Sequence, residues 1–156
     1  MFPVVAVLLL SSIAFSQDAQ HQQGVEQRGD QAMGFSHQMT QHHFALTPDG
    51  GTIEVEANDP TDQASRNAIR QHLEHIATLF KQGDFDLPMF IHAQTPPGVP
   101  TMQRLKSDIT YEALPTAKGA EVKISSKNQE AVSAIHQFLA FQIKDHRTGD
   151  TTEVSH

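Results

Sequence analysis

The feature that most constrains the fold is a pattern of two strands, a turn and a helix that occurs twice. Residues 69–84 (IRQHLEHIATLFKQGD) align without gaps on residues 135–150 (IHQFLAFQIKDHRTGD). Identical residues stand at Ile69/Ile135, Gln71/Gln137, Leu73/Leu139, Gly83/Gly149 and Asp84/Asp150. We interpret the copies as two ββα units related by duplication or convergence. The alternative is that two amphipathic helices ending in Gly-Asp look alike by composition.

Each predicted helix follows two β-capable runs that are joined by a turn. Residues 42–47 and 52–57 flank a Pro-Asp-Gly-Gly sequence, and glycine supplies the positive φ that tight hairpin turns require. In the second run, Ile53 and Val55 alternate with glutamates, so one face is expected to be buried. The second unit repeats this order with strands at 109–114 and 120–125. Helices are expected over residues 60–82 and 128–146, and a short extra strand over 88–92.

One ββα unit exposes an apolar sheet face that it cannot bury alone. Two units can pair their hairpins, which predicts an α+β fold with one antiparallel sheet and two helices packed on one face. We expect a single domain over residues 32–150. Its ββα units span about 41–84 and 108–150 and are joined by a Pro-rich connection at 94–100, and residues 151–156 are expected to form a disordered tail.

Residues 1–16 (MFPVVAVLLLSSIAFS) are typical of a secretory signal peptide. Their apolar run is shorter than the roughly 20 residues that span a bilayer. Small residues at Ala14 and Ser16 fit a cut before Gln17. Residues 17–31 are rich in Gln and poor in apolar side chains, so a flexible tail is expected there. The predicted location is the periplasm or the outside of the cell, with no membrane span.

Charge and cysteine usage exclude several classes of function. The chain has 11 Lys and Arg against 18 Asp and Glu, a net charge of −7, and no cysteine. An acidic chain without a basic cluster is a poor nucleic-acid binder. The absence of cysteine excludes a disulfide framework, thiol catalysis and cysteine-ligated iron–sulfur clusters. The fold must therefore rest on its apolar core.

Histidine and methionine supply the candidate metal ligands. The chain has 10 His, and the densest patch of His and Met lies at residues 33–43 (MGFSHQMTQHH). Imidazole and thioether are the ligands left for a soft or borderline metal when thiolate is absent. We predict a transition-metal site, with copper before zinc as the cofactor, drawn from His37, His43, His75, His92, Met33, Met39 and Met89.

Strand alternation separates two neighbouring histidines of this patch. His42 is expected on the core side with Phe44, and His43 on the open side of the sheet. On the first helix, His72 should lie at the edge of the apolar stripe and His75 near solvent.

The stripe of the second helix contains two polar residues near its end. Gln142 needs a partner if it is buried. His146 is interpreted as a residue that interacts with the dipole at the helix C-terminus.

Three functional hypotheses remain, and none names a substrate. The first is an exported small binding protein for a transition metal. The second is an envelope accessory or protein-interaction domain without metal, with a protein as its partner. The third and weakest is a small hydrolase or metal-dependent enzyme, because the chain has no nucleophile elbow, P-loop or zinc-protease motif and no catalytic residue can be named. The oligomeric state is left open.

The strings MGFSHQMTQHHF, GGTIEVEANDP, PMFIH and PPGVP resemble a group of small exported bacterial proteins of unknown function. Some members of that group bear the name aspartate carbamoyltransferase. This chain does not fit that name, because it is much shorter than a catalytic chain of that enzyme and lacks its Ser-Thr-Arg-Thr carbamoyl-phosphate motif. The resemblance implies export and assigns no functional residue.

Overall fold

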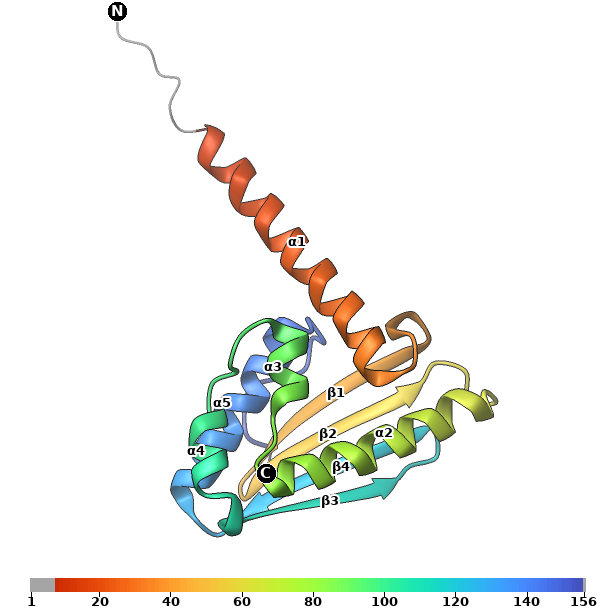
Figure 1. The fold of residues 1–156 in the computed structure, drawn as a ribbon, viewed down its shortest axis with the longest axis vertical. Coiled ribbons are helices and arrows are strands. Elements are labelled where there is room, and N and C mark those ends of the chain that lie inside the picture. Colours follow the sequence, from red (N-terminus) through yellow and green to blue (C-terminus); the bar gives the residue numbers. More distant parts are fainter. Residues whose placement is uncertain (1–7, 156) are drawn as a thin grey trace, which may run out of the picture.

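The computed structural model describes residues 8–155 of the chain (Figure 1). Residues 1–7 of the predicted signal peptide lie outside the described part. The elements follow one another as α1 (Leu8–Met33), η1 (His37–Met39), β1 (Thr40–Thr47), β2 (Gly50–Ala57), α2 (Gln63–Gln82), α3 (Asp86–His92), α4 (Val99–Arg104), η2 (Lys106–Asp108), β3 (Ile109–Pro115), β4 (Gly119–Ser126) and α5 (Gln129–Asp145).

The four strands form one antiparallel sheet in the order β1-β2-β4-β3. The two hairpins therefore meet at β2 and β4, with Ile53 opposite Val122 and Val55 opposite Ala120. These four side chains are buried, as the alternation in the sequence predicts. The predicted fold of two ββα units in one antiparallel sheet is confirmed.

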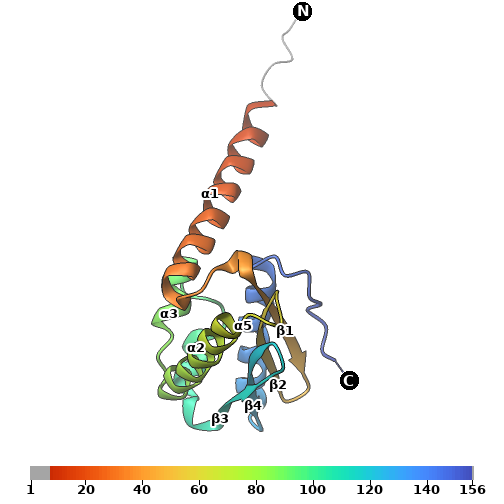
Figure 2. The same ribbon diagram turned by 90° about the vertical axis from the view of Figure 1, so that its right-hand side faces the viewer.

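Helices α2 and α5 cover one face of this sheet (Figure 2). Helix α2 packs mainly on β3 and β4, whereas α5 packs mainly on β1 and β2, so each helix covers the strands of the other unit. Local signals define their ends. Asp62 and Asn128 cap the N-termini through their side chains, and Gly83 ends α2 in a left-handed conformation with φ 81°.

An aromatic cluster fills the core beneath α2. The rings of Phe80 and Phe85 stack with centroids 4.4 Å apart, and Phe138 of α5 meets each of them edge-on at 5.9 Å. Tyr111 of β3 completes the cluster at 5.9 Å from Phe80. Because these rings are large and almost completely buried, the cluster is a major contributor to hydrophobic stabilisation.

The structure differs from the expectation at residues 17–31, which are helical and belong to α1 instead of a flexible tail. Few apolar side chains hold this helix in place, although Val25 is buried. Polar contacts anchor it instead: His21 Nε2 lies 2.9 Å from Asp145 Oδ1, and Arg28 Nε donates to the Ile91 carbonyl at 2.8 Å. Composition alone could not reveal partners so distant in sequence. Within residues 8–155, no helix has both the length and the apolar character that a membrane crossing requires.

The strand expected at residues 88–92 is wrong, because these residues form α3. Pro88 lies in the first turn, where a helix tolerates proline since its backbone nitrogen needs no partner. The Pro-rich connection ends at Gly98, where φ is 85° and an added Cβ would lie 2.1 Å from the Ala134 carbonyl oxygen. Glycine is thus required there both for conformation and for close approach to α5.

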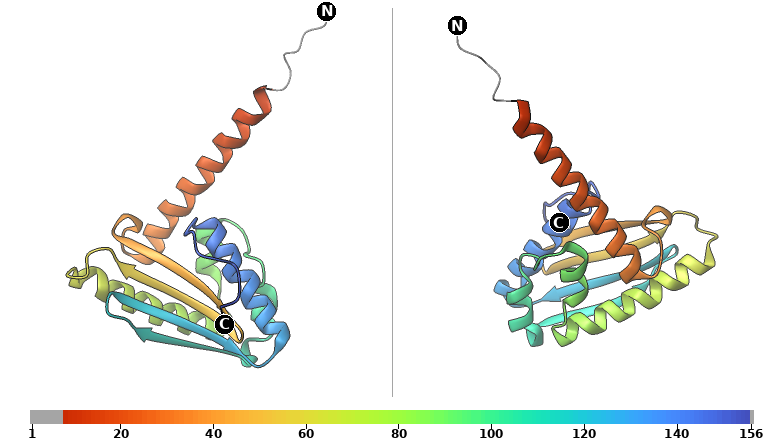
Figure 3. Two further views of the ribbon diagram at one scale, coloured as in Figure 1. Left: turned by 180° about the vertical axis from the view of Figure 1, so that it is seen from behind. Right: turned by 45° about the horizontal axis from the view of Figure 1, so that its top comes forward.

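The chain after α5 follows the edge of the sheet (Figure 3). Val154 forms a parallel bridge with Leu46 of β1, and the Ser155 backbone N–H donates to the Leu46 carbonyl at 2.9 Å. Residues 151–155 are therefore ordered against β1, in contrast to the disordered tail that was expected. The backbone groups of an edge strand explain this, since they are free to pair with another segment.

Candidate functional site: two histidine pockets

Four histidines from four different elements line one cavity on the β1 side of the core. They are His42 of β1, His72 of α2, His92 of α3 and His146 at the end of α5. The cavity has a volume of about 70 Å³. Apart from these imidazoles its wall is almost entirely apolar, and it includes Met33, Phe44, Val55, Leu73, Phe138 and Gln142. We call this space the inner cavity.

The imidazoles of the inner cavity lie close together. The rings of His42 and His146 are parallel, with centroids 5.6 Å apart, and His92 meets His146 edge-on at 4.9 Å. Phe44 supports the pair, with its ring centroid 5.9 Å from that of His146. His72 is held on the other side by Phe35, whose ring lies 5.6 Å away. Aromatic packing therefore fixes the positions of these rings.

Burial keeps three of these imidazoles unprotonated. It lowers the pKa of His42 and of His72 to about 4, and that of His146 to about 3. Repulsion between the imidazoles acts in the same direction, because His42 is close to His72 and to His146. At neutral pH these side chains are uncharged and each has a nitrogen lone pair available to a ligand.

His92 has a different environment and is only 1% exposed. Its Nδ1 lies 2.5 Å from Asp145 Oδ2, and its Nε2 lies 2.9 Å from Gln142 Oε1. Burial raises the pKa of Asp145, but hydrogen bonds from His92 and His21 outweigh it, so the pKa lies below its usual value. Both ring nitrogens of His92 are thus engaged, which makes it a fixed support and not a free base.

Gln142 carries an unpartnered polar atom at the cavity wall. Its side chain is buried, and its Nε2 has no hydrogen-bond partner within the described residues. A buried amide without a partner costs about 1–3 kcal/mol unless a ligand or water satisfies it. Gln142 is therefore the one polar group besides the imidazoles at the wall of the inner cavity that has hydrogen-bonding capacity left, among the described residues.

A second pocket lies on the other side of His42 and His146 and has a volume of about 260 Å³. His37 and His43 also line it, together with Thr40, Gln41 and Thr148. We call it the outer pocket. His42 and His146 line both spaces, so the inner cavity and the outer pocket adjoin at this pair.

A carboxylate holds each of the two additional histidines in the outer pocket. His37 Nδ1 lies 2.9 and 3.0 Å from the two oxygens of Asp30, and His43 Nδ1 lies 3.2 Å from Asp150 Oδ1. Asp150 also accepts a hydrogen bond from the Phe44 backbone N–H. Burial raises the pKa of Asp150, but these contacts and one from Thr148 leave it below its usual value.

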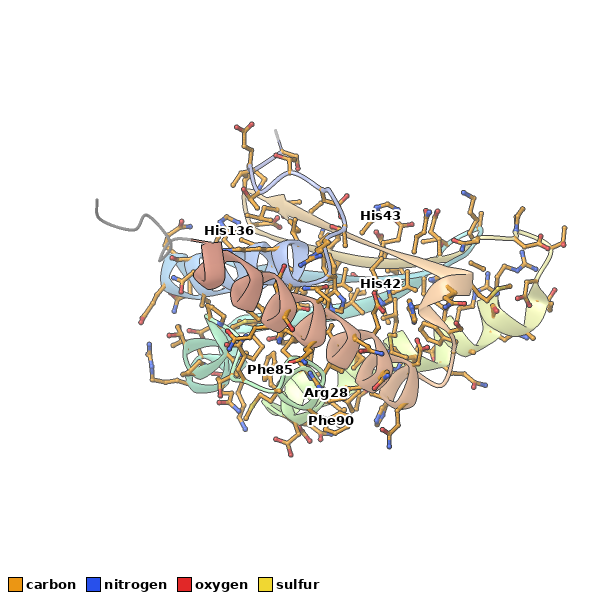
Figure 4. The ribbon with its side chains drawn as sticks, turned by 90° about the horizontal axis from the view of Figure 1, so that it is seen from above. Arg28, His42, His43, Phe85, Phe90 and His136 are labelled. Carbon is orange, nitrogen blue, oxygen red and sulfur yellow. The ribbon has the colours of Figure 1, made fainter. Side chains whose placement is uncertain are left out.

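The strand assignments of the first histidines are confirmed. His42 lies on the core side opposite Val55, and His43 on the open side opposite Glu54. Figure 4 shows the two labelled side chains on opposite sides of β1. On α2, His72 is half-buried and His75 is exposed, as their angular positions predict.

The seven side chains predicted as metal ligands do not meet at one point. His37 and His43 line the outer pocket, whereas His92 and Met33 line the inner cavity. Met89 packs against the core, Met39 is 49% exposed, and His75 is exposed on α2. Among residues 8–155, no three His, Asp or Glu side chains are arranged so that they could hold a metal ion without moving.

The predicted ligand set left out His42, His72 and His146, all of which line the inner cavity, although the spacing of His72 and His75 on the first helix also fits two corners of a metal site. A signal was available in the alignment of the two units. His146 stands where the first unit has Phe80, and Gln142 stands where it has Ile76. Polar residues at two positions of a repeated apolar stripe indicate that this end of the second helix does not pack against apolar side chains alone.

No model of a known protein family matches the chain, and no curated protein or solved structure is significantly similar to it. The resemblance to small exported bacterial proteins therefore stays a prediction. Function has to be argued from the two pockets alone.

Proposed function

We propose that the protein is an exported small binding protein whose ligand is a transition-metal ion, copper before zinc, bound in the inner cavity. The observation that supports this proposal is the convergence of four imidazoles from β1, α2, α3 and α5 on one apolar cavity. One buried and three half-buried imidazoles around an apolar cavity bring more polar groups together there than packing alone requires, and a ligand would satisfy them. Export is the expectation from residues 1–16, and a cysteine-free chain suits that environment.

The chemistry of the cavity suits a soft or borderline metal. Neutral imidazole is the form that binds metal, and burial keeps His42 and His146 in that form by lowering their pKa values to about 4 and 3. Met33 adds a thioether, which favours Cu(I) over harder cations. Carboxylates are far less suited to Cu(I), and none is among the residues that line this cavity.

We assign the ligand role to His42 and His146, with His72 or Met33 as the third ligand. His92 supports them from behind, because its ring packs edge-on against His146 while Asp145 and Gln142 hold its two nitrogens. For their nitrogens to meet one ion, the imidazoles have to turn away from the packed arrangement seen in this structure. The role of Asp145 then resembles that of a carboxylate that orients a metal site.

Native mass spectrometry of the mature chain, titrated with Cu(I), Cu(II) and Zn(II), tests this proposal. We expect one ion retained per chain at micromolar metal and loss of that ion in the double variant His42→Ala, His146→Ala. His75→Ala serves as the matched control, because His75 is exposed on α2 and lines neither pocket. The proposal fails if the wild-type chain retains no metal, or if the double variant retains it as well as the control does.

The exposed side chains of Phe90 and Met39 favour a second candidate function, a protein-interaction domain without metal. Phe90 on α3 is 48% exposed and Met39 is 49% exposed, although large apolar side chains are usually buried. Under this alternative, metal titration is negative, and Phe90→Ser weakens binding to a partner protein without lowering stability. We rank it second, because two separate residues do not make a contiguous apolar patch.

A further inference from the structure

We infer that the outer pocket is the landing site at which a transition-metal ion is captured before it passes between His42 and His146 into the inner cavity. This inference rests on the proposed function and adds a route and two capture residues, His37 and His43. The arrangement of the side chains around the outer pocket supports this inference.

The first argument is the way in which carboxylates hold the capture residues. His37 and His43 each present Nδ1 to an aspartate, at 2.9 Å from Asp30 and at 3.2 Å from Asp150. A histidine that binds metal through one nitrogen usually gives the other N–H to a carboxylate, which fixes the ring and makes the ligating nitrogen more basic. In His43, Nε2 is then the nitrogen left for a ligand, whereas Nε2 of His37 also lies 3.7 Å from Glu26 Oε2, so a metal ion bound there would have this carboxylate beside it.

The second argument is the charge around the outer pocket. Besides Asp30 and Asp150, Glu26 Oε2 lies 3.7 Å from His37 Nε2, and Glu54 stands opposite His43 in the sheet. Four carboxylates thus flank the outer pocket, in a chain whose net charge is −7. Their field attracts cations and raises the rate at which an ion reaches the pocket. The residues that line the inner cavity include no carboxylate, so it offers no comparable attraction.

The third argument is continuity between the two spaces. His42 and His146 line both, and their parallel rings stand with centroids 5.6 Å apart. An ion held by these two imidazoles is reachable from either side. It can therefore exchange ligands one at a time, first from His37 and His43 to the pair, and then from the pair to Met33 and His72. Stepwise exchange avoids the large cost of stripping the ion of all its ligands at once.

The two pockets therefore have different tasks. The outer pocket is polar and flanked by carboxylates, which suits fast capture. The inner cavity is apolar and lined by neutral imidazoles, which suits retention. Removal of the capture residues should slow loading and leave the final occupancy unchanged.

Stopped-flow measurements on the mature chain test this inference. Cu(I) or Zn(II) is supplied as the complex with a chromophoric chelator, and its transfer to the protein is followed by absorbance. We expect the double variant His37→Gln, His43→Gln to load roughly tenfold more slowly than the wild type at low ionic strength. The difference should shrink as salt is added. His75→Ala is again the control, and the thermal midpoint of each variant checks that the fold is kept.

A second pair of changes separates charge from ligation. Asp30→Asn and Asp150→Asn keep both imidazoles and an oxygen for the backbone contact to Phe44, but they remove two negative charges. This variant should load more slowly than the wild type, with the same final stoichiometry.

The outcomes distinguish this inference from the proposed function. If the wild-type protein takes up no metal, both the proposed function and this inference are wrong. If wild-type protein loads metal and the His37, His43 variant loads it at the same rate, only the landing site is refuted. A variant that instead loses one bound ion per chain also refutes it, because the outer pocket would then be a resident site.

Discussion

Helices α2 and α5 occupy matching places in the two units, yet they present different side chains to the inner cavity. On α2, Ile76 and Phe80 continue an apolar stripe that lines the cavity and reaches the aromatic cluster. At the aligned positions of α5, Gln142 and His146 bring polar groups to the same cavity. Equivalent positions of the two helices therefore supply part of the apolar wall on one side and polar groups on the other.

The positions one turn earlier show the opposite exchange. His72 on α2 aligns with Phe138 on α5, and Phe138 is buried among Phe80 and Phe85. Helix α2 thus contributes one polar residue to the inner cavity and α5 contributes two, and each helix also contributes one ring to the aromatic cluster. Because each helix lies across the strands of the other unit, these residues are brought together from both halves of the chain.

The largest effect is expected from copying the polar residue of α5 onto α2. Phe80→His places a polar imidazole among the rings of Phe85, Tyr111 and Phe138 in place of a phenyl ring that packs on all three. We expect a loss of about 4 kcal/mol in the free energy of unfolding, from lost aromatic packing and the cost of burying a polar ring. Urea denaturation at pH 7 measures it. A loss below about 1 kcal/mol would show that the aromatic cluster tolerates a polar side chain, contrary to what its packing indicates.

Acid should act on the cavity and leave the aromatic core unaffected. The pKa values of His42 and His146 in the folded chain, about 4 and 3, lie below the unfolded value of 6.5. The unfolded chain therefore binds more protons, and stability falls as the pH drops from about 6.5 to about 4. His42 alone contributes on the order of 3 kcal/mol to this loss. The contributions of the two histidines do not add fully, because both line one cavity.

Urea denaturation at pH 7, 6, 5 and 4 measures this dependence. Asp145 and Asp150 have lowered pKa values as well, so they add a loss in the same direction at still lower pH. A stability that stays constant between pH 7 and pH 4 contradicts buried, neutral histidines.

The reverse exchange on α5 should alter stability little and function strongly. His146→Phe replaces an imidazole by a ring that can pack on Phe44 and against the apolar wall of the cavity. We expect a change within about 1 kcal/mol in the free energy of unfolding, and a flatter dependence of stability on pH. Metal retention in native mass spectrometry should be lost. A His146→Phe variant that loses more than about 1 kcal/mol of stability and still binds metal would contradict the assignment of His146 as a metal ligand.

The smallest effect is expected at the exposed histidine of α2. His75→Ala removes a side chain that lines neither pocket, so stability should change by less than about 0.5 kcal/mol. Metal uptake and its rate should match the wild type. A clear defect in this variant would mean that the surface of α2 takes part in binding.

Local sequence patterns predicted much of the fold. Alternation at Ile53 and Val55, the Asp-Gly-Gly turn and the stripe of Ile69, Leu73 and Ile76 predicted the sheet and both long helices. Helix α3 was missed, because a short apolar run after a proline fits a strand as well as a first helical turn. Helix α1 was missed, because polar contacts to Asp145 and Ile91, which are distant in sequence, hold it in place.

The site was harder to predict than the fold. Sequence placed His42 and His72 on the correct faces, but it could not show that His146 stacks on His42. Distances between β1 and the end of α5 depend on how the two units dock, and no local pattern encodes that. The predicted ligand set therefore mixed residues of both pockets with exposed side chains.

The crossing of the two helices over each other's strands also has a consequence for how the chain folds. Each helix packs mainly on the hairpin of the other unit and only in part on its own, so a nascent first unit lacks most of the contacts of its helix. Those contacts form only after residues of the second unit arrive, which raises the contact order and slows folding. Truncation between the units should therefore leave two unfolded fragments in place of two small domains.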